Sequence, residues 1–494
     1  MKSYQQLKEL FTKLADLKHV QAITDWDEQT MMPQGGGAAR AKALATLQSH
    51  IHEILIDKRN GELIEQAKLE EVKNPWDQAN LRWMEKAYRE ATCLPVELVQ
   101  KRTEASLHCV QAWRSMRAEN NWREFEPLLT KLFNYVKEAA TIQSEAFKLS
   151  PYDVQIDHYL PGFKQEIITP IFKKLKSELP SLIKKIIEKQ QAEKIIALNG
   201  FYPAPKQRNL GLNLMKILGF DFNHGRLDVS HHPFCGGVPT DVRITTRYNE
   251  EELISSAMAI CHETGHARYE QGLPKEWLTQ PVGHALGMAI HESQSLLVEM
   301  QACRSQEFMG VLVKAVREEF GEHPGFTAEN LHCHYTRVKP GYIRVDADEV
   351  TYPLHVILRY ELEQKLFNDE LTIADLPDAW NEAMTHYLGL STEGNFKNGV
   401  MQDVHWPSGI FGYFPAYTLG ALIAAQLFTA ATKEDKTILP EISKANFKPL
   451  FSWLNKHIHS RGSSVGYQTL LKEATGDALQ SDYFLHHIQK RYIN

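Results

Sequence analysis

Apolar residues recur along most of the chain at steps of three and four positions, which is the spacing of an amphipathic helix. Between Tyr4 and Thr24, leucine and phenylalanine side chains at this spacing share one face of the expected helix. The same pattern predicts further helices over residues 39–56, 78–92, 124–148, 164–178 and 181–197. The chain shows no internal repeat and no long Pro- or Ser-rich linker, so we expect one helical domain over residues 1–494, with room for two lobes around a cleft.

The middle of the chain departs from the helical pattern. Residues 241–248, DVRITTRY, alternate between two kinds of side chain, which predicts a strand with Val, Ile, Thr and Tyr on one face and Asp, Arg and Thr on the other. A helix is expected immediately afterwards, because Asn249 is a good N-cap and the three glutamates after it suit the positive end of a helix dipole. Gly272 and Pro274 supply its stop signal.

The composition excludes several classes of protein. The 494 residues are 43% hydrophobic and 23% charged, which is ordinary for a globular protein and excludes fibrous and low-complexity chains. Lys and Arg together number 55 against 61 for Asp and Glu, giving a net charge of -6. Because there is no basic excess to neutralise a phosphate backbone, we expect no nucleic-acid partner.

Three features of the sequence indicate the cellular compartment in which we expect the protein. The most apolar stretch, residues 417–432, contains Gln426 and is shorter than the ~20 residues of a membrane span, so we expect no membrane insertion. The N-terminal sequence MKSYQQLKELFTKL has helical spacing rather than the apolar core of a signal peptide. The six cysteines lie far apart without a CxxC pair, which favours a reducing cytoplasm.

The strongest functional signal is the sequence HExxH at residues 262–266, within the helix expected after the strand. Its two histidines, His262 and His266, project from one face of a helix, where both imidazoles can bind one metal ion. Glu263 lies about 100° around the helix from His262. It therefore stands beside the metal rather than on it, where it can accept a proton from a metal-bound water and act as the catalytic base.

A catalytic zinc site needs a third protein ligand and an open fourth position. Gly272 stands six residues after His266, where HExxHxxGxxH proteins have their third histidine, so the ligand must come from elsewhere. Glu292 is the best candidate, because it lies in a segment with helical spacing that can pack against the first helix. Its neighbour His291 and Glu299 remain alternatives.

Six sequence blocks resemble those of the carboxypeptidase Taq family, the thermostable metallocarboxypeptidases, and occur in the same order. They are HPF at 232–234, DxRxT at 241–245, HExxH at 262–266, HESQ at 291–294, IRxxAD at 343–348 and GxxQDxHW at 399–406. The early WDEQTMMP, residues 26–33, looks like the N-terminal block of the family, so the resemblance covers nearly the whole chain. Two departures, Leu160 in the usual EPG and Gln34 where a second proline is common, lie outside the expected metal site.

The resemblance implies a mainly α fold: a large, saddle-shaped helical body with a deep substrate groove and a small β-sheet beside the metal site, similar to neurolysin and angiotensin-converting enzyme. It also implies that His262, His266 and Glu292 bind the metal and that Glu263 is the base. Zn²⁺ is the expected ion, with Co²⁺ supporting higher activity in many members. The resemblance further implies a homodimer.

Release of only the last residue of a peptide requires a fixed cation for the free C-terminal carboxylate. Arginine suits this task best, because its planar fork pairs with both carboxylate oxygens. Arg243, on the polar face of the expected strand, and Arg344, within IRxxAD, are the candidates inside matched blocks. We expect at least one of them to bind substrate rather than to form an ordinary surface ion pair.

Five further residues are candidates for supporting roles. His232, His405 and Tyr413 can stabilise the oxyanion or contact the substrate backbone, although a structural hydrogen bond or aromatic packing explains each about as well. Gln402 and Asp403 are expected just behind the metal site, where Asp403 can orient a metal-binding histidine.

These expectations lead to a cytoplasmic zinc carboxypeptidase of broad specificity that acts on peptides with a free C-terminus. One alternative is a helical zinc oligopeptidase that cleaves peptides internally, because metal and base alone do not distinguish the two activities. The other is a non-catalytic helical peptide-binding protein. The intact Glu263 argues against this last alternative.

Overall fold

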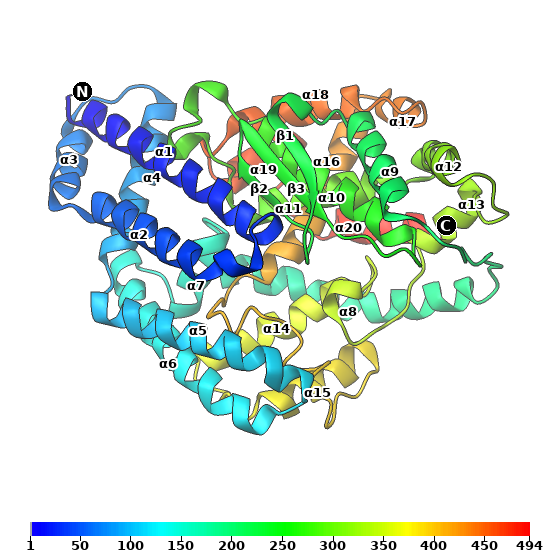
Figure 1. Cartoon of the computed structure of the whole chain (residues 1–494), viewed down its shortest axis with the longest axis horizontal. Coiled ribbons are helices and arrows are strands. Elements are labelled where there is room, and N and C mark those ends of the chain that lie inside the picture. Colours follow the sequence, from blue (N-terminus) through cyan, green and yellow to red (C-terminus); the bar gives the residue numbers. More distant parts are fainter. Residues whose placement is uncertain (1) are drawn as a thin grey trace.

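The computed structural model describes residues 2–494, which form a mainly helical body with one small sheet (Figure 1). In chain order the helices are α1 (Lys2–Thr30), α2 (Gly37–Ile56), α3 (Lys58–Leu69), α4 (Pro75–Thr92), α5 (Val96–Ala118), α6 (Trp122–Phe147), α7 (Pro151–Tyr159), α8 (Gln165–Gln190), α9 (Ala204–Ile217), α10 (Ile254–Gln271), α11 (Gly287–Leu296), α12 (Gln306–Phe320), α13 (Ala328–Tyr335), α14 (Tyr352–Phe367), α15 (Leu376–Leu388), α16 (Pro415–Glu434), α17 (Ile438–Ile442), α18 (Lys448–His457), α19 (Tyr467–Thr475) and α20 (Asp482–Tyr492). The fold class predicted from the sequence, mainly α with a small β-sheet, is confirmed.

The helices are arranged around three groups of buried apolar side chains. The largest group extends from α5 to α20. A separate group holds α1 to α4 together, and these helices form the left-hand part of Figure 1. A third group joins the sheet to α9 and α10. The sheet is therefore anchored on α10, the helix that carries HExxH.

The sheet consists of β1 (Gly225–Val229), β2 (Cys235–Val238) and β3 (Asp241–Thr246), in the order β1-β3-β2. β3 pairs in parallel with β1 and antiparallel with β2. The alternating segment DVRITT is therefore the central strand of the sheet. The edge beside the site belongs to β2, which directly follows the HPF block.

Most predicted helices are confirmed, but two boundaries differ. Residues 164–178 and 181–197 were expected to form two helices, yet α8 continues through Pro180 and ends at Gln190. The buried apolar face of α8 continues on both sides of Pro180, at Leu179 and Leu182. Its burial outweighs the roughly 3 kcal/mol that an internal proline costs a helix.

The second difference concerns the start of the HExxH helix. α10 begins at Ile254 rather than just after Asn249. The Asn249 side chain accepts a hydrogen bond from the Glu251 N–H and closes a turn, while the Glu250 carboxylate accepts one from the Ala204 N–H at the start of α9. Both side chains therefore accept hydrogen bonds from backbone N–H groups, as capping residues do. Asn249 closes a turn, however, and Glu250 binds the start of α9 rather than that of α10.

The apolar segment at residues 417–432 forms most of α16, and its side chains are buried in the largest core. Within residues 2–494, no helix combines the length and the apolar character that crossing a bilayer would require.

Candidate metal centre and substrate pocket

Three helices meet at the HExxH motif because two of them carry glycine at the contact. A Cβ atom on Gly265 of α10 would lie 2.6 Å from the Ser295 Cα of α11. A Cβ atom on Gly420 of α16 would lie 2.8 Å from both the Cβ and the Cγ of Glu292. These glycines allow α10 and α16 to approach α11 closely from two sides. This packing fixes where Glu292 stands relative to the two motif histidines.

The side chains of His262, His266 and Glu292 converge so that one ligand atom from each lies within 4.8 Å of the others. The two Glu292 carboxylate oxygens lie 3.9 Å from His262 Nε2 and 3.5 Å from His266 Nε2. Donors of a tetrahedral zinc site with bonds of about 2.0–2.2 Å are separated by about 3.3–3.6 Å. The cluster therefore has the composition and spacing of a metal site.

The ring of His262 is held from behind by a carboxylate. Its Nδ1 lies 2.9 Å from Glu299 Oε2, and the other Glu299 oxygen accepts a hydrogen bond from Arg304. Burial alone would lower the pKa of His262, but the hydrogen bond to Glu299 and the charges of Glu292 and Glu299 raise it to about 10. This contact leaves Nε2 as the nitrogen that faces Glu292.

The ring of His266 is held in an equivalent way by a histidine. Its Nδ1 lies 2.6 Å from His291 Nδ1, and His291 Nε2 lies 2.7 Å from Glu270 Oε1. A consistent set of tautomers has His266 donating to His291 and His291 donating to Glu270, which leaves the lone pair of His266 Nε2 directed at Glu292. The two alternatives to Glu292, His291 and Glu299, both contact the Nδ1 side of a motif histidine.

Glu263 lies beside the cluster in a nearly dry environment. It is 7% exposed and lines the same cavity as His262 and Glu292. Burial, together with the negative charges of Glu292 and Glu299, raises the pKa of Glu263 to about 7, although the charge of His262 opposes the shift. A carboxylate with such a pKa can both accept and return a proton near neutral pH.

The cavity next to the cluster has a volume of about 430 Å³ and extends from Pro233, in the HPF block, to Arg344 and the inner face of α16. Its apolar wall includes Leu296, Met300 and Ala421. An enclosed, mostly apolar cavity with a few convergent charged groups is the usual form of a small-ligand site.

Arg344 is the sequence-predicted arginine that lines this cavity. Its guanidinium donates to the Tyr352 hydroxyl and forms a two-pronged ion pair with Asp403, and it lies 4.8 Å above the ring of Tyr417. Asp403 is shared with a second arginine, Arg359, which is fully buried on α14. Two guanidinium groups around one carboxylate leave a net positive charge at this end of the cavity.

The expected role of Asp403 is therefore wrong. It binds Arg344 and Arg359, and it contacts neither of the motif histidines. Burial alone would raise the pKa of Asp403, but the two arginines hold it well below its usual range. Gln402 likewise lies behind Arg344 rather than behind the cluster, since its side chain accepts from the Arg344 N–H and donates to the carbonyl of Tyr342.

Arg243 does not line the cavity that contains Arg344. Its guanidinium forms a two-pronged ion pair with Asp241 on the same face of β3 and lies 4.5 Å above the ring of Trp26. Thr245, the third residue of the DxRxT block, accepts from the Phe234 N–H and so fixes the HPF turn. These contacts give the block a structural role, and the expectation that Arg243 binds substrate is not supported by its position.

His232 is exposed, and its backbone carbonyl accepts a hydrogen bond from Ser230. His405 is buried among aromatic rings, with Nε2 3.4 Å from the Tyr417 hydroxyl. Burial lowers the pKa of His405 to about 4, so it is neutral at pH 7. Tyr413 packs 5.4 Å from Tyr417, and burial raises the pKa of its phenol. His405 and Tyr413 thus stand beside Tyr417, which lines the cavity, while His232 adjoins Pro233.

Several residues of the site were not predicted from the sequence: Glu270, Arg304, Tyr352, Arg359 and Tyr417. One of them had a visible signal. Arg359 directly follows the mostly apolar segment LHVIL of α14. An arginine inside a buried helix needs a carboxylate partner, so its position in the sequence is informative. The others become recognisable only when the packing of α11, α14 and α16 is known.

Comparison with known proteins agrees with this geometry. The sequence matches the family described as "Carboxypeptidase Taq (M32) metallopeptidase" over residues 6–492. It is 37% identical to thermostable carboxypeptidase 1 of Thermus thermophilus, covering 99% of this chain and 98% of that protein. It is 31% identical to the Pyrococcus furiosus protein of the same name, again covering 99% and 98%.

Solved structures show the same relationship. The structure of Trypanosoma cruzi metallocarboxypeptidase 1 superposes with a TM-score of 0.98 at 41% identity, with full coverage of both chains. The M32 carboxypeptidase of Deinococcus radiodurans superposes with a TM-score of 0.95 at 31% identity, covering 100% of this chain and 99% of that one. The chain therefore belongs to the carboxypeptidase Taq family of metallopeptidases, as its motifs indicated.

Proposed function

We propose that the protein is a zinc-dependent carboxypeptidase that releases C-terminal amino acids from peptides of varied sequence. The observation that carries the proposal is the shared cavity: Glu263, Arg344 and two members of the metal cluster, His262 and Glu292, all line it. A base, a metal site and a fixed cation at one cavity are the parts that cleavage next to a free carboxylate requires.

The donor set fits a divalent metal of the zinc type. Two imidazole nitrogens and one carboxylate are typical ligands of catalytic zinc, and such sites keep one position open. Each histidine is also held on its Nδ1 side, by Glu299 or by His291, as is usual for metal-binding histidines. When bound, the metal supplies Lewis acidity that polarises a carbonyl and lowers the pKa of water.

The chain itself supplies the proton transfers and the positioning. Glu263 accepts the proton of the attacking water and passes it to the nitrogen of the departing amino acid. The raised pKa of its carboxyl suits both steps. Arg344 holds the substrate carboxylate, with its own orientation fixed by Asp403 and Tyr352. Neutral His405 and the phenol of Tyr413 are candidate hydrogen-bond donors to the oxyanion.

Two properties distinguish this proposal from internal cleavage. Arg344 is backed by Asp403 and by Arg359, which is fully buried on α14, so protein rather than solvent lies behind its guanidinium. In addition, Asp403 neutralises only one of its two arginines, so the site retains a positive charge for an incoming carboxylate. Both properties favour a substrate that ends at Arg344.

A pair of peptides that differ only at the C-terminus tests the proposal. The metal-loaded enzyme should remove residues one at a time from the free-acid peptide and leave its amidated twin nearly intact, as followed by mass spectrometry. Equal cleavage of the two forms, or release of internal fragments, would identify an oligopeptidase instead. Glu263→Gln is the control for contaminating peptidases, because its ligands are unchanged.

Other expectations from the sequence stay predictions. These are the single domain over residues 1–494, the homodimer, the cytoplasmic location and the higher activity with Co²⁺. The absence of a nucleic-acid partner is likewise a prediction.

A further inference from the structure

A large cavity lies between the end of α10, the turn after α9 and the start of α18, and its lining shares no residue with the substrate pocket. Its volume is about 680 Å³. Arg268 of α10 lines it, and two exposed lysines, Lys216 of α9 and Lys448 of α18, stand at its rim. None of these residues has a role in the proposed peptidase reaction.

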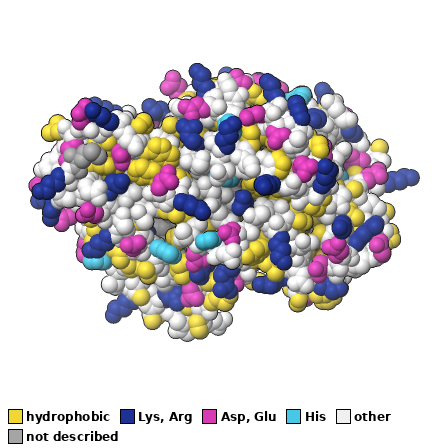
Figure 2. Space-filling view, turned by 90° about the horizontal axis from the view of Figure 1, so that it is seen from above, with side chains coloured by type: hydrophobic (Ala, Val, Ile, Leu, Met, Phe, Trp, Pro, Cys, Tyr) yellow, Lys and Arg dark blue, Asp and Glu magenta, His cyan; other side chains and the backbone are white. Residues whose placement is uncertain are grey.

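The charged side chains that line this cavity are all cationic. Its lining contains three permanent cations and no carboxylate. Within residues 2–494, no ion pair involves Arg268, Lys216 or Lys448. The positive end of the α18 helix dipole adds to the same field, because α18 begins at Lys448 on the cavity wall. On the face of the molecule in Figure 2, Lys and Arg are interspersed with Asp and Glu.

Arg268 is the most unusual of the three cations. Its guanidinium carbon lies 4.7 Å above the ring of Phe451, and its Nε is buried without a hydrogen-bond partner. Asp221 is the carboxylate whose charge acts on Arg268, and no ion pair joins the two side chains. Asp221 itself is bound to His224. Within residues 2–494 no hydrogen bond uses the terminal nitrogens of this partly buried guanidinium, so they stay available to an anion from outside the chain.

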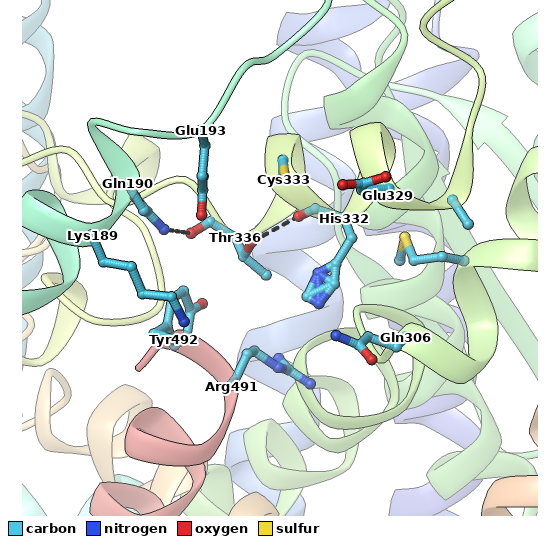
Figure 3. Close-up of a pocket in the computed structure, with 12 residues that line it drawn as sticks. Lys189, Gln190, Glu193, Gln306, Glu329, His332, Cys333, Thr336, Arg491 and Tyr492 are labelled. Carbon is cyan, nitrogen blue, oxygen red and sulfur yellow. Dashed lines mark hydrogen bonds between the residues drawn. The ribbon is translucent and has the colours of Figure 1, made fainter. Parts of the chain in front are cut away.

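A second cavity, of about 430 Å³, shows that this arrangement is not a general property of the surface (Figure 3). It also contains cations, Lys189 and Arg491, but Glu193 and Glu329 line it as well. Lys189 donates to the Ile493 carbonyl and Arg491 to the Met300 carbonyl, so each of these cations already has a hydrogen-bond partner in the chain. The cavity beside Arg268 has no carboxylate in its lining, and within residues 2–494 its three cations donate to no backbone carbonyl.

We propose that the Arg268 cavity binds a phosphate group, carried by inorganic phosphate or by a small phosphate monoester. A dianion with several acceptor oxygens matches a partly buried guanidinium flanked by two lysines better than a single carboxylate does, because each added charge interacts with all three cations. The cavity volume leaves room for the organic part of a monoester beside Phe447 and Phe451.

The site lies against α10 and is connected to α11 only through His459. Arg268 lies two residues after His266 on α10. His459, also on the cavity wall, has Nε2 2.9 Å from Oε1 of Gln294 in the HESQ block of α11. The proposal does not depend on the peptidase reaction, and it can be tested without measuring catalysis.

Isothermal titration calorimetry of the metal-loaded protein with inorganic phosphate, and separately with adenosine monophosphate, tests the site. Ionic strength is held constant with chloride. We expect saturable one-to-one binding that weakens by roughly tenfold or more in Arg268→Gln, as loss of a charge-assisted hydrogen bond predicts. Tighter binding of the monophosphate would assign the site to monoesters, and equal affinity would assign it to inorganic phosphate.

Two further variants keep the result interpretable. The double substitution Lys216→Ala and Lys448→Ala removes only exposed side chains, so it tests the site even if Arg268→Gln folds poorly, and it should also weaken binding several-fold. Lys189→Ala, in the cavity of Figure 3, is the matched control and should bind phosphate normally. Absence of saturable binding, or binding that persists unchanged in the Arg268 and double-lysine variants, would overturn the proposal.

Discussion

Substituting Gly420 by alanine tests whether the packing of α16 against α11 sets the position of Glu292. The added Cβ would lie 2.8 Å from both Cβ and Cγ of Glu292 and 3.3 Å from its carbonyl carbon. Favourable contacts between carbon atoms begin at about 3.5 Å. The Glu292 side chain and the adjoining turn of α11 must therefore move away from α16 by several tenths of an ångström or more.

We expect Gly420→Ala to lower the metal affinity more strongly than it lowers the free energy of unfolding. Overpacking typically costs about 1–3 kcal/mol. Alanine recovers about 1 kcal/mol of this, because glycine is a poor residue inside a helix. The net loss of unfolding free energy should be about 0–2 kcal/mol, whereas displacing a ligand or its support commonly lowers metal affinity about 10–100-fold.

Competition with a chelator measures the metal affinity of Gly420→Ala, and thermal unfolding measures its stability. Gly310→Ala is the matched control, since Gly310 is also inside a helix and a Cβ there would meet nothing within 4 Å. This control should gain about 0.5–1 kcal/mol of stability and keep the parent affinity. If Gly420→Ala also kept the parent affinity, the close contact with Glu292 would not position the ligand.

Three further predictions concern the cavity and the histidines. Glu263→Gln should retain the parent metal content and lose about 10²–10⁴-fold in kcat, because only proton transfer is removed; near-normal turnover would exclude Glu263 as the base. Arg344→Ala should lower kcat/KM on free-acid peptides by roughly ten- to a hundredfold and leave amidated peptides unaffected, whereas Arg243→Ala should affect both forms equally, which kinetics on the two peptide forms would check. Because protonated His262 cannot bind a metal and its pKa in the metal-free protein is raised to about 10, zinc affinity should increase by about tenfold per pH unit between pH 6 and 8. Glu299→Gln should flatten this dependence, and an equally steep slope in that variant would contradict the role of Glu299.

The parts of the site that lie within one element could be predicted from the sequence. The spacing of four residues places His262 and His266 on one face of α10 whatever the rest of the chain does, and it places Glu263 beside them. The third member of the cluster depends on how two helices pack. The sequence pattern therefore favoured Glu292 but left His291 and Glu299 as alternatives, and the helix packing at Gly265 and Gly420 places Glu292 on the Nε2 side of both motif histidines.

The structure places Arg243 and Asp403 differently from what we expected, for a physical reason. Arg243 and Asp403 are charged residues inside matched blocks, and a sequence does not show which ion pair such residues prefer. Asp241 stands two residues before Arg243 and therefore on the same face of β3, where it satisfies the guanidinium. Asp403 forms ion pairs with Arg344 and Arg359, which are 59 and 44 positions away in the sequence. Partners as remote as these are determined by tertiary packing.

The most direct test of the central claim is a zinc titration of the chelator-treated enzyme, with release of the C-terminal residue from a free-acid peptide as the readout. Activity should be absent without metal, rise linearly with added zinc and reach its plateau at one equivalent per chain. Glu292→Ala, titrated in parallel, should show no sharp equivalence point and only partial recovery in excess zinc, because two histidines alone bind the ion weakly. Full activity in the metal-free enzyme, or a Glu292→Ala titration identical to the parent, would contradict the account.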